Sequence, residues 1–199
     1  IDLDSPPYAY STNKTEGTHS LEVEGVEATE NTNSFTIDAN ENFLIQFSFN
    51  PQGNAVSTTP LILEYGNTSG SDYENIDSAD SFTFGVNTVT NRLGFTFWDS
   101  SLGIAKTISG GTWNGYNSWT TVTVKRTGGV ITINGADAEV FSGAFNTPTD
   151  NKVKFRHGFA GGSNIVLYDN FIFLRGSDTR AGATDSTTVA QYTFNQTST

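Results

Sequence analysis

Short apolar stretches alternate with polar, turn-forming stretches along the whole chain. Runs rich in Phe, Ile, Val and Thr are separated by clusters of Gly, Asn, Ser and Asp, at a spacing of roughly 8–12 residues that is typical of sandwiches and barrels. Helical periodicity is almost absent, and apolar side chains instead recur at every second position, which is the period of a strand. We therefore expect an all-β protein, with strands at 20–26, 34–38, 43–50, 61–65, 81–86, 92–99, 120–126, 130–133, 152–159, 165–174 and 188–194.

Two of these runs show which side chains should face a core. In the run at 43–49, every odd-numbered position is Phe or Ile. The run at 92–99 places one Leu and two Phe on one face and Trp98 on the other. The Gly pair at 128–129 separates two further runs, and such a pair predicts a two-residue hairpin turn. Strands with one apolar face that are joined by hairpins predict a two-sheet antiparallel jelly-roll sandwich.

The same pattern predicts the domain organisation. Residues 1–176 hold most of the expected strands and form one jelly-roll β-sandwich. Residues 177–187 are low in apolar side chains and are typical of a linker-like loop. Residues 188–199 contain the final expected strand, which either closes the sandwich or begins a next module.

Composition narrows the classes of partner. The 199 residues include 21 acidic and 10 basic side chains, for a formal charge of -11, which disfavours nucleic acid and anionic membranes as partners. No apolar run approaches the ~20 residues that a membrane helix needs, so we expect no membrane insertion. The acidic excess fits a protein that binds cations such as calcium. There is no Cys, so disulfides cannot stabilise the chain, and their absence favours a bacterial secreted or cell-surface protein.

Four segments carry a resemblance to a known family. They are "GTHSLEVEG" at 17–25, "FLIQFSFNPQ" at 43–52, "SWTTVTVKRTGGVITINGADA" at 118–138 and "NKVKFRHGFAGGSNIVLYDNFIFLRG" at 151–176. Their order resembles the concanavalin A-like lectin/glucanase superfamily, especially its laminin-G-like and carbohydrate-binding jelly rolls. The resemblance implies the fold more strongly than a function, because this fold hosts lectins, adhesins, lyases and glycosidases. It also implies that Trp119 is a core residue.

Five residues are candidates for ligand binding. Trp98 faces away from the predicted core and precedes Asp99, and sugar rings stack well on an indole face. Trp113, Asn114 and Tyr116 lie in a Gly/Asn-rich loop, where aromatic rings and amides together suit sugar binding. Two alternatives stay open: Trp98 is core if both faces of its sheet are covered, and the loop aromatics form a hydrophobic plug.

The resemblance also implies a structural calcium site. In calcium-stabilised jelly rolls, an Asp before Asn on the last core strand binds the ion, and Asp169 occupies that position here. Calcium takes six to eight oxygen ligands, which Asp2, Asp4 and Glu22 are placed to supply from nearby segments. A second acidic group lies in "GSDYENIDSAD" at 70–80, and we interpret it as a solvated loop, because it lacks the spacing of an EF-hand.

Catalytic patterns are weak. Lys154, Arg156 and His157 are basic residues on one strand that suit acidic sugars, although ordinary solvent-facing charges explain Lys154 and Arg156 better. Paired carboxylates of the glycosidase kind and a nucleophile with its base are not evident. The leading hypothesis is therefore a non-catalytic, lectin-like, calcium-stabilised module that binds a polysaccharide or other glycan. The alternatives are an adhesin module with a protein or peptide ligand, and a polysaccharide lyase or glycosidase.

Overall fold

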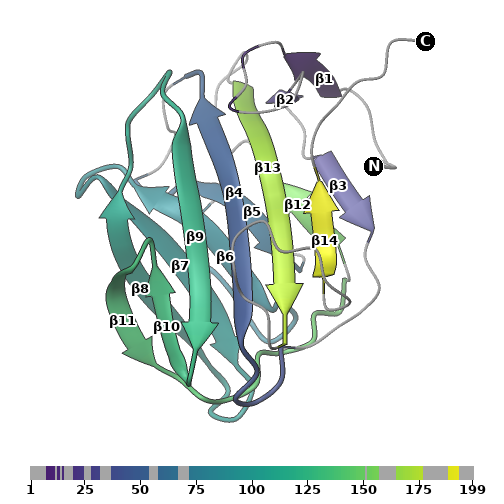
Figure 1. Cartoon of the computed structure of the whole chain (residues 1–199), viewed down its shortest axis with the longest axis vertical. Coiled ribbons are helices and arrows are strands. Elements are labelled where there is room, and N and C mark those ends of the chain that lie inside the picture. Colours follow the sequence, from purple (N-terminus) through teal and green to yellow (C-terminus); the bar gives the residue numbers. More distant parts are fainter. Residues whose placement is uncertain are drawn as a thin grey trace.

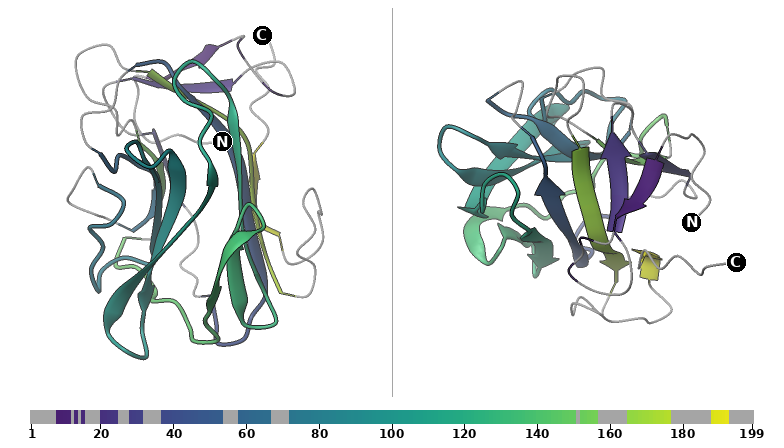
Figure 2. Two further views of the ribbon diagram at one scale, coloured as in Figure 1. Left: turned by 90° about the vertical axis from the view of Figure 1, so that its left-hand side faces the viewer. Right: turned by 90° about the horizontal axis from the view of Figure 1, so that it is seen from above.

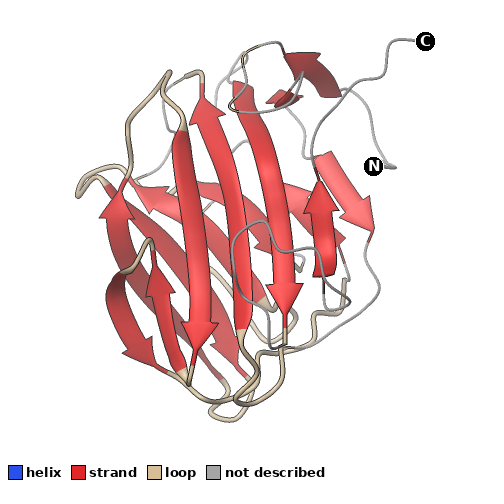
Figure 3. Ribbon diagram, viewed as in Figure 1, coloured by secondary structure: helices blue, strands red, loops and turns tan. Residues whose placement is uncertain are grey.

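The computed structural model of the chain describes residues 8–11, 13, 15, 20–24, 28–31, 37–53, 58–66, 72–150, 152–156, 165–176 and 188–192. Within these residues the secondary structure consists of strands, turns and loops, without a helix (Figure 3). The strands form two antiparallel sheets that pack face to face (Figures 1 and 2). This arrangement confirms the predicted all-β, two-sheet antiparallel sandwich.

The larger sheet has eight strands. Its main path runs β1 (Tyr8–Ser11), β2 (Ser20–Glu24), β13 (Ile165–Arg175), β4 (Phe43–Pro51), β9 (Thr120–Thr127), β10 (Val130–Ile133) and β11 (Ala136–Val140). The eighth strand, β14 (Thr188–Tyr192), pairs with the second half of β13, whereas β2 pairs with the first half. The smaller sheet runs β3 (Ala28–Asn31), β12 (Lys152–Phe155), β5 (Leu61–Tyr65), β6 (Phe82–Asn87), β7 (Arg92–Asp99) and β8 (Ile104–Thr112).

Aromatic side chains from both sheets fill the space between the layers. The four odd-numbered side chains of β4 predicted to face inward all belong to the core. Phe47 of β4 meets Phe84 of β6 edge-to-face at a ring distance of 5.0 Å, and Phe97 of β7 stacks on Phe145 at 4.7 Å. Such pairs contribute about 0.5–1.5 kcal/mol each beyond the area that they bury, so they help to fix how the sheets pack.

Part of the outer face of the smaller sheet is covered by the loop at 72–80. Tyr73 from this loop is fully buried, and its ring lies over Gly85 and Gly94 on neighbouring strands. A methyl group at Gly94 would lie 2.2 Å from Cζ of Tyr73, so only glycine allows this approach. The hydroxyl of Thr83, on the same outer face, donates to the carbonyl of Tyr73. The sheet is therefore buried on both faces here.

The hairpins that follow β9 and β10 both turn on two residues with positive φ, and the first is the turn predicted from its Gly pair. Gly128 and Gly129 both have positive φ (57° and 77°) and join β9 to β10. Asn134 and Gly135 also have positive φ (49° and 71°), as a type I′ turn requires. The Asn134 side chain accepts from the Thr123 amide at 2.7 Å, which fixes the second turn against β9.

Some strand boundaries differ from the prediction. Four strands were not predicted, namely β1, β3, β8 and β11. Strand β8 shows no clear alternation of apolar and polar side chains, because its first four side chains are half-buried or exposed and two glycines lie near its end. In the run predicted at 34–38, Ile37 and Asp38 belong to a loop, and 34–36 lie outside the described residues. The linker-like loop at 177–187 also lies outside them.

Candidate functional site

The structure does not bring the five predicted ligand residues into one site. Strand β7 pairs with β8 from Arg92 opposite Thr112 to Asp99 opposite Ile104. Trp98 and Asp99 therefore lie at one end of β7, and the loop with Trp113 follows β8 at the other end. Since a strand rises about 3.3 Å per residue, the two groups are separated by roughly 20 Å.

Trp98 lies on the outer face of the smaller sheet, as its alternation predicts. The Leu and Phe side chains of β7 on the opposite face are buried in the core, whereas Trp98 is half-buried. Its amide donates to the Ser81 carbonyl at 3.0 Å, and it pairs with Ala105 on β8, which is exposed. Thr107, two residues further along β8, is also exposed, and its hydroxyl pairs with that of Thr96 at 2.9 Å. Small side chains thus flank one side of the indole.

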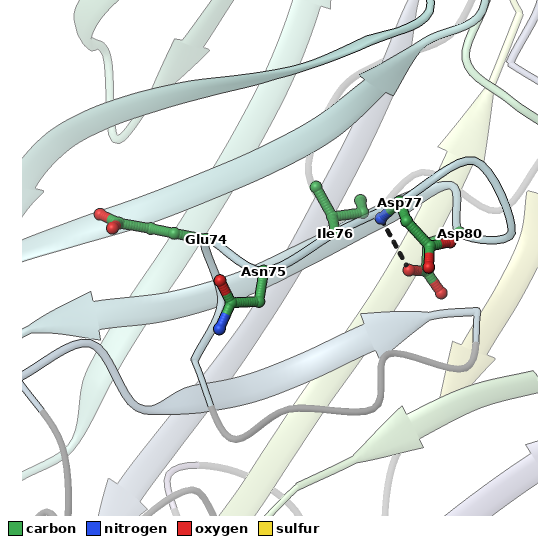
Figure 4. A pocket seen from close by; sticks show the side chains of 5 residues that line it. All are labelled: Glu74, Asn75, Ile76, Asp77 and Asp80. Atoms are coloured by element: carbon green, nitrogen blue, oxygen red, sulfur yellow. Dashed lines mark hydrogen bonds between the residues drawn. The ribbon is translucent and has the colours of Figure 1, made fainter.

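The loop at 72–80 borders Trp98 on the other side. Asn146 connects the two: its amide donates to the Trp98 carbonyl at 3.3 Å, and its side chain donates to the carbonyls of Ser78 and Asp80. The same loop encloses an open hollow of about 290 Å³, lined by Glu74, Asn75, Ile76, Asp77 and Asp80. Figure 4 shows the hydrogen bond from the Asp77 amide to the Asp80 carboxylate, at 3.2 Å. An aromatic ring, small side chains and an acidic loop therefore share this face.

Asp99 does not share that face with Trp98. Its side chain is almost fully buried, and its Oδ1 accepts from the amides of Ser101 and Leu102 and from the Ser101 hydroxyl. Lys106 Nζ lies 3.8 Å from its other carboxylate oxygen. Burial alone raises the pKa of Asp99, but the hydrogen bonds from Ser101 and Leu102 and the charge of Lys106 outweigh it, so the pKa lies below its ordinary value. The hydrogen bonds to Asp99 thus stabilise the turn between β7 and β8.

The loop aromatics pack against each other. Trp113 is buried in the core, and its ring meets that of Tyr116 edge-to-face at 4.9 Å. Asn114 is exposed, but its side-chain amide donates to the Trp119 carbonyl at 2.8 Å, and its backbone amide donates to the Thr120 hydroxyl at 3.1 Å. This packing favours the alternative interpretation, in which the aromatics anchor the loop.

Trp119 is not a core residue, contrary to the prediction. It is half-buried, and its indole NH donates to Asn13 Oδ1 at 3.0 Å. The Ser20 hydroxyl donates to the Asn13 carbonyl, and the amide and hydroxyl of Thr15 donate to Asp169 Oδ2 at 2.9 and 2.8 Å. Asn13 and Thr15 therefore lie on the outer face of the larger sheet, and Trp119 is one of their anchors.

These hydrogen bonds supply partners for the carboxylate predicted to hold calcium. Asp169 is fully buried at an irregularity in the pairing of β13 with β4, where Asn170 has a positive φ of 54°. Glu22 lies on the adjacent strand β2, whereas Asp2 and Asp4 lie outside the described residues. Among the residues that the structure describes, no three His, Cys, Asp or Glu side chains form a group that could hold a metal ion.

Lys154 on β12 and Arg156 just after that strand are not ordinary surface charges, contrary to the interpretation from sequence. Lys154 is almost fully buried, with Nζ 3.2 Å from the buried carboxylate of Glu64 and 3.5 Å from Asp150. Arg156 lies 3.5 Å from the same Glu64 oxygen. Acidic partners thus neutralise both cations, which weakens the case for an acidic sugar here. His157 lies outside the described residues.

Comparisons with known proteins identify no family. No family model matches the sequence, and no curated protein matches it. In the described part of the chain, no helix is long and apolar enough to cross a membrane.

Solved structures with a similar fold are binding domains of botulinum neurotoxins. The serotype D binding domain aligns with a TM-score of 0.57 at 12% identity, over 84% of this chain and 40% of that one. The neurotoxin DC binding domain in complex with rat synaptotagmin II aligns with a TM-score of 0.55 at 15% identity, over 83% of this chain and 41% of that one. The same domain in complex with SialylT aligns with a TM-score of 0.55 at 15% identity, over 83% of this chain and 40% of that one. This chain therefore spans about two fifths of these structures, and at such low identity the likeness shows the fold alone.

Proposed function

We propose that this protein is a non-catalytic, lectin-like glycan-binding module of a secreted or cell-surface bacterial protein, with Trp98 as its stacking platform. The observation that carries the proposal is the position of Trp98. Its indole is half-buried on an outer sheet face, while the other large apolar side chains of β7 point into the core. The apolar face of a sugar ring stacks favourably on such a surface.

The surroundings of Trp98 suit a sugar better than an apolar ligand. Exposed Ala105 and Thr107 leave room beside the indole, and Thr107 offers a hydroxyl for a sugar hydroxyl. Affinity would come from the stacked ring and a few oriented hydrogen bonds. The fold that the chain shares with toxin binding domains, one of them in complex with SialylT, supports a place in the concanavalin A-like lectin superfamily.

A glycan array with the purified protein, with calcium and with chelator, tests the proposal. We expect binding that falls at least about tenfold in Trp98→Ala, because truncating a central aromatic contact costs more than 1.4 kcal/mol. Trp119→Ala, a tryptophan of similar burial on the other sheet, is the matched control and should keep its affinity. Folding of both variants is checked by circular dichroism.

A folded Trp98→Ala variant that binds like the wild type would refute this site. Binding that needs calcium would support the ion expected from the sequence.

A second candidate is an adhesin module with a protein ligand. Leu102 (62%) and Ile104 (47%) are exposed apolar side chains at the start of β8, and Val140 (78%) is another at the end of β11. Strands β8 and β11, which carry two of them, are joined by an ion pair between Lys106 and Glu139 at 3.7 Å. The adjacent exposed side chains Leu102 and Ile104 are the apolar surface that a protein ligand would cover. An array without binding in either condition would favour this candidate.

A further inference from the structure

We propose that β8 is a dimerisation edge, where a second copy of this chain adds its own β8 to form one continuous sheet. The smaller sheet ends at β8, and in the described part of the chain β7 is the one strand that pairs with it. The left view of Figure 2 looks onto this side of the molecule. A strand at the end of a sheet presents backbone N–H and C=O groups with which another strand can pair.

The hydrogen bonds of Trp98 show which backbone groups of β7 point away from β8. The Trp98 amide donates to the Ser81 carbonyl at 3.0 Å, and the Trp98 carbonyl accepts from the Asn146 amide at 3.3 Å. Both backbone groups of Trp98 therefore face the β6 side of the strand. In an antiparallel ladder the direction of these groups alternates from one residue to the next, so Phe97 directs both of its groups to β8.

The pairing register extends this alternation to β8. Phe97 lies opposite Lys106, so the backbone groups of Lys106 bond back to β7. The alternate residues Ala105, Thr107 and Ser109 therefore direct their N–H and C=O groups to the free edge. Ala105 and Thr107 are exposed, and Ser109 is half-buried. These three residues offer about six hydrogen-bonding groups to an added strand.

Strand β8 lacks features that often prevent pairing at a sheet edge, namely a proline, an outward charge or a bulge. The run 104–110 contains no proline, and its pairing with β7 is regular. Its one charged side chain, Lys106, points inward and lies 5.3 Å from the Phe141 ring. The Lys106 ammonium lies 3.8 Å from a carboxylate oxygen of Asp99 and 3.7 Å from one of Glu139. An added strand would therefore bury no unpaired charge here.

The distribution of charge favours a second copy of this chain as the occupant. The chain carries a formal charge of -11, but positions 100–136 contain no Asp or Glu. Two copies that approach through β8 would therefore repel each other less than through the acidic remainder of the chain. A cationic partner, in contrast, would be attracted to that remainder and would gain little at β8.

The outward backbone groups of β8 are also self-complementary. In a two-fold antiparallel pairing, the residues that direct their groups outward must lie opposite one another. A two-fold axis at Thr107 meets this condition. It places Thr107 opposite Thr107 of the second copy, and Ala105 opposite Ser109 of the second copy. All three outward residues of each copy would then be paired.

The inward side chains of β8 fit the same register. The exposed side chain of Ile104 (47%) would lie opposite Gly110 of the second copy, where there is no side chain to obstruct it. Lys106 would lie opposite Ile108 of the second copy rather than opposite another lysine. The pairing would therefore cover an exposed apolar side chain without bringing like charges of β8 together.

Such a dimer would place two Trp98 side chains on one outer sheet face, and the consequence for binding rests on the proposed function. Trp98 lies one strand in from β8, so three strand spacings and an offset of four residues separate the two copies of it, roughly 20 Å in all. A surface that carries many copies of a glycan would engage both sites at once, and avidity would exceed the affinity of either site.

Sedimentation velocity over a range of protein concentrations tests the dimer. We expect a species of twice the 21.4 kDa chain mass, with a Kd of about 10–100 μM, because an edge contact is smaller than a standard interface. Thr107→Pro removes the central outward N–H and should weaken the dimer at least about tenfold. An edge strand tolerates proline where the N–H faces solvent. Thr107→Val keeps the N–H and is the matched control, which should dimerise like the wild type.

The absence of Cys from the chain allows a direct test of the register. In Thr107→Cys the two thiols would meet at the two-fold axis, with Cα atoms about 5.5 Å apart, which suits a disulfide. Mild oxidation should therefore give a covalent dimer. Val89→Cys, at an exposed position (75%) in the turn between β6 and β7, should cross-link at least about tenfold more slowly.

Three results would overturn the inference: a chain that stays monomeric at about 1 mM, a dimer that Thr107→Pro leaves intact, or equal cross-linking of the two cysteine variants. If Thr107→Pro does not fold, as judged by circular dichroism, the cross-linking comparison decides alone. None of these results bears on whether Trp98 binds a glycan, which the array tests separately. A failed dimer and a failed glycan site are therefore distinguishable.

Discussion

At the scale of single residues, Arg126 is a buried charge that stabilises the core by donating hydrogen bonds to loop carbonyls. It lies on the inner face of β9 and is fully buried, yet its guanidinium meets carbonyl oxygens. It donates to Glu41 O and Gly143 O at 2.6 Å each and to Asp38 O. Burial lowers the pKa of Arg126, and Glu41 and Asp38 oppose that shift. One side chain thus joins two loops to the end of the sandwich.

Arg126→Lys should destabilise the protein by about 2–4 kcal/mol, because one ammonium cannot reach carbonyls in three directions and buried acceptors lose their donors. Three Phe ring centroids lie within 5.8 Å of the guanidinium, and a lysine ammonium cannot stack on them as the planar guanidinium does. Urea unfolding followed by fluorescence measures the change. Arg92→Lys, the same substitution at an exposed position, should stay within about 0.5 kcal/mol. Equal stability of the two variants would contradict a stabilising role for the Arg126 hydrogen bonds.

At the scale of elements, the loop at 72–80 and the strands beneath it form one packed unit. Gly94→Ala would place a methyl group 2.2–2.4 Å from two ring atoms and the hydroxyl oxygen of Tyr73, so the ring or the strand must shift. We expect a loss of about 1–3 kcal/mol, the usual cost of overpacking. Differential scanning calorimetry of a double-mutant cycle with Tyr73→Ala measures the coupling. The glycine substitution should cost much less once the ring is gone. Additive effects would mean that Tyr73 does not set this cost.

The elements also show what could be predicted from the sequence. Strands β4 and β7 follow from alternation alone, since each buries one apolar face, and the same alternation places Trp98 outward. The edge strands β8 and β11 could not be found this way, because their side chains are mostly half-buried or exposed. The burial of Trp113 and the half-exposure of Trp119 depend on contacts distant in sequence, such as that with Asn13. The outward position of Trp98 was therefore predicted, but not its separation from the loop aromatics.

At the scale of the whole molecule, both outer sheet faces are partly covered from within the chain. The loop at 72–80 covers part of the smaller sheet, and Asn13 and Thr15 lie on the larger one. In the described part of the smaller sheet, the outer surface of β8 beside Trp98 stays exposed. The described residues thus leave the outer sheet surface open beside the indole, where the proposed site lies.

The whole molecule also carries a formal charge of -11. As pH falls, the loss of this charge and the protonation of Asp99 change the stability of the fold in opposite directions. Mild acidification reduces self-repulsion and should first raise stability. Asp99 has a folded-state pKa below its ordinary value, so its contribution is fully present above about pH 4 and is lost as pH falls through the folded-state pKa. Asp99→Asn should therefore be less stable than the wild type at pH 7, and the difference should shrink in strong acid. Urea unfolding of both proteins across this pH range measures it. A difference that stays constant with pH would show that the charge of Asp99 contributes nothing to stability.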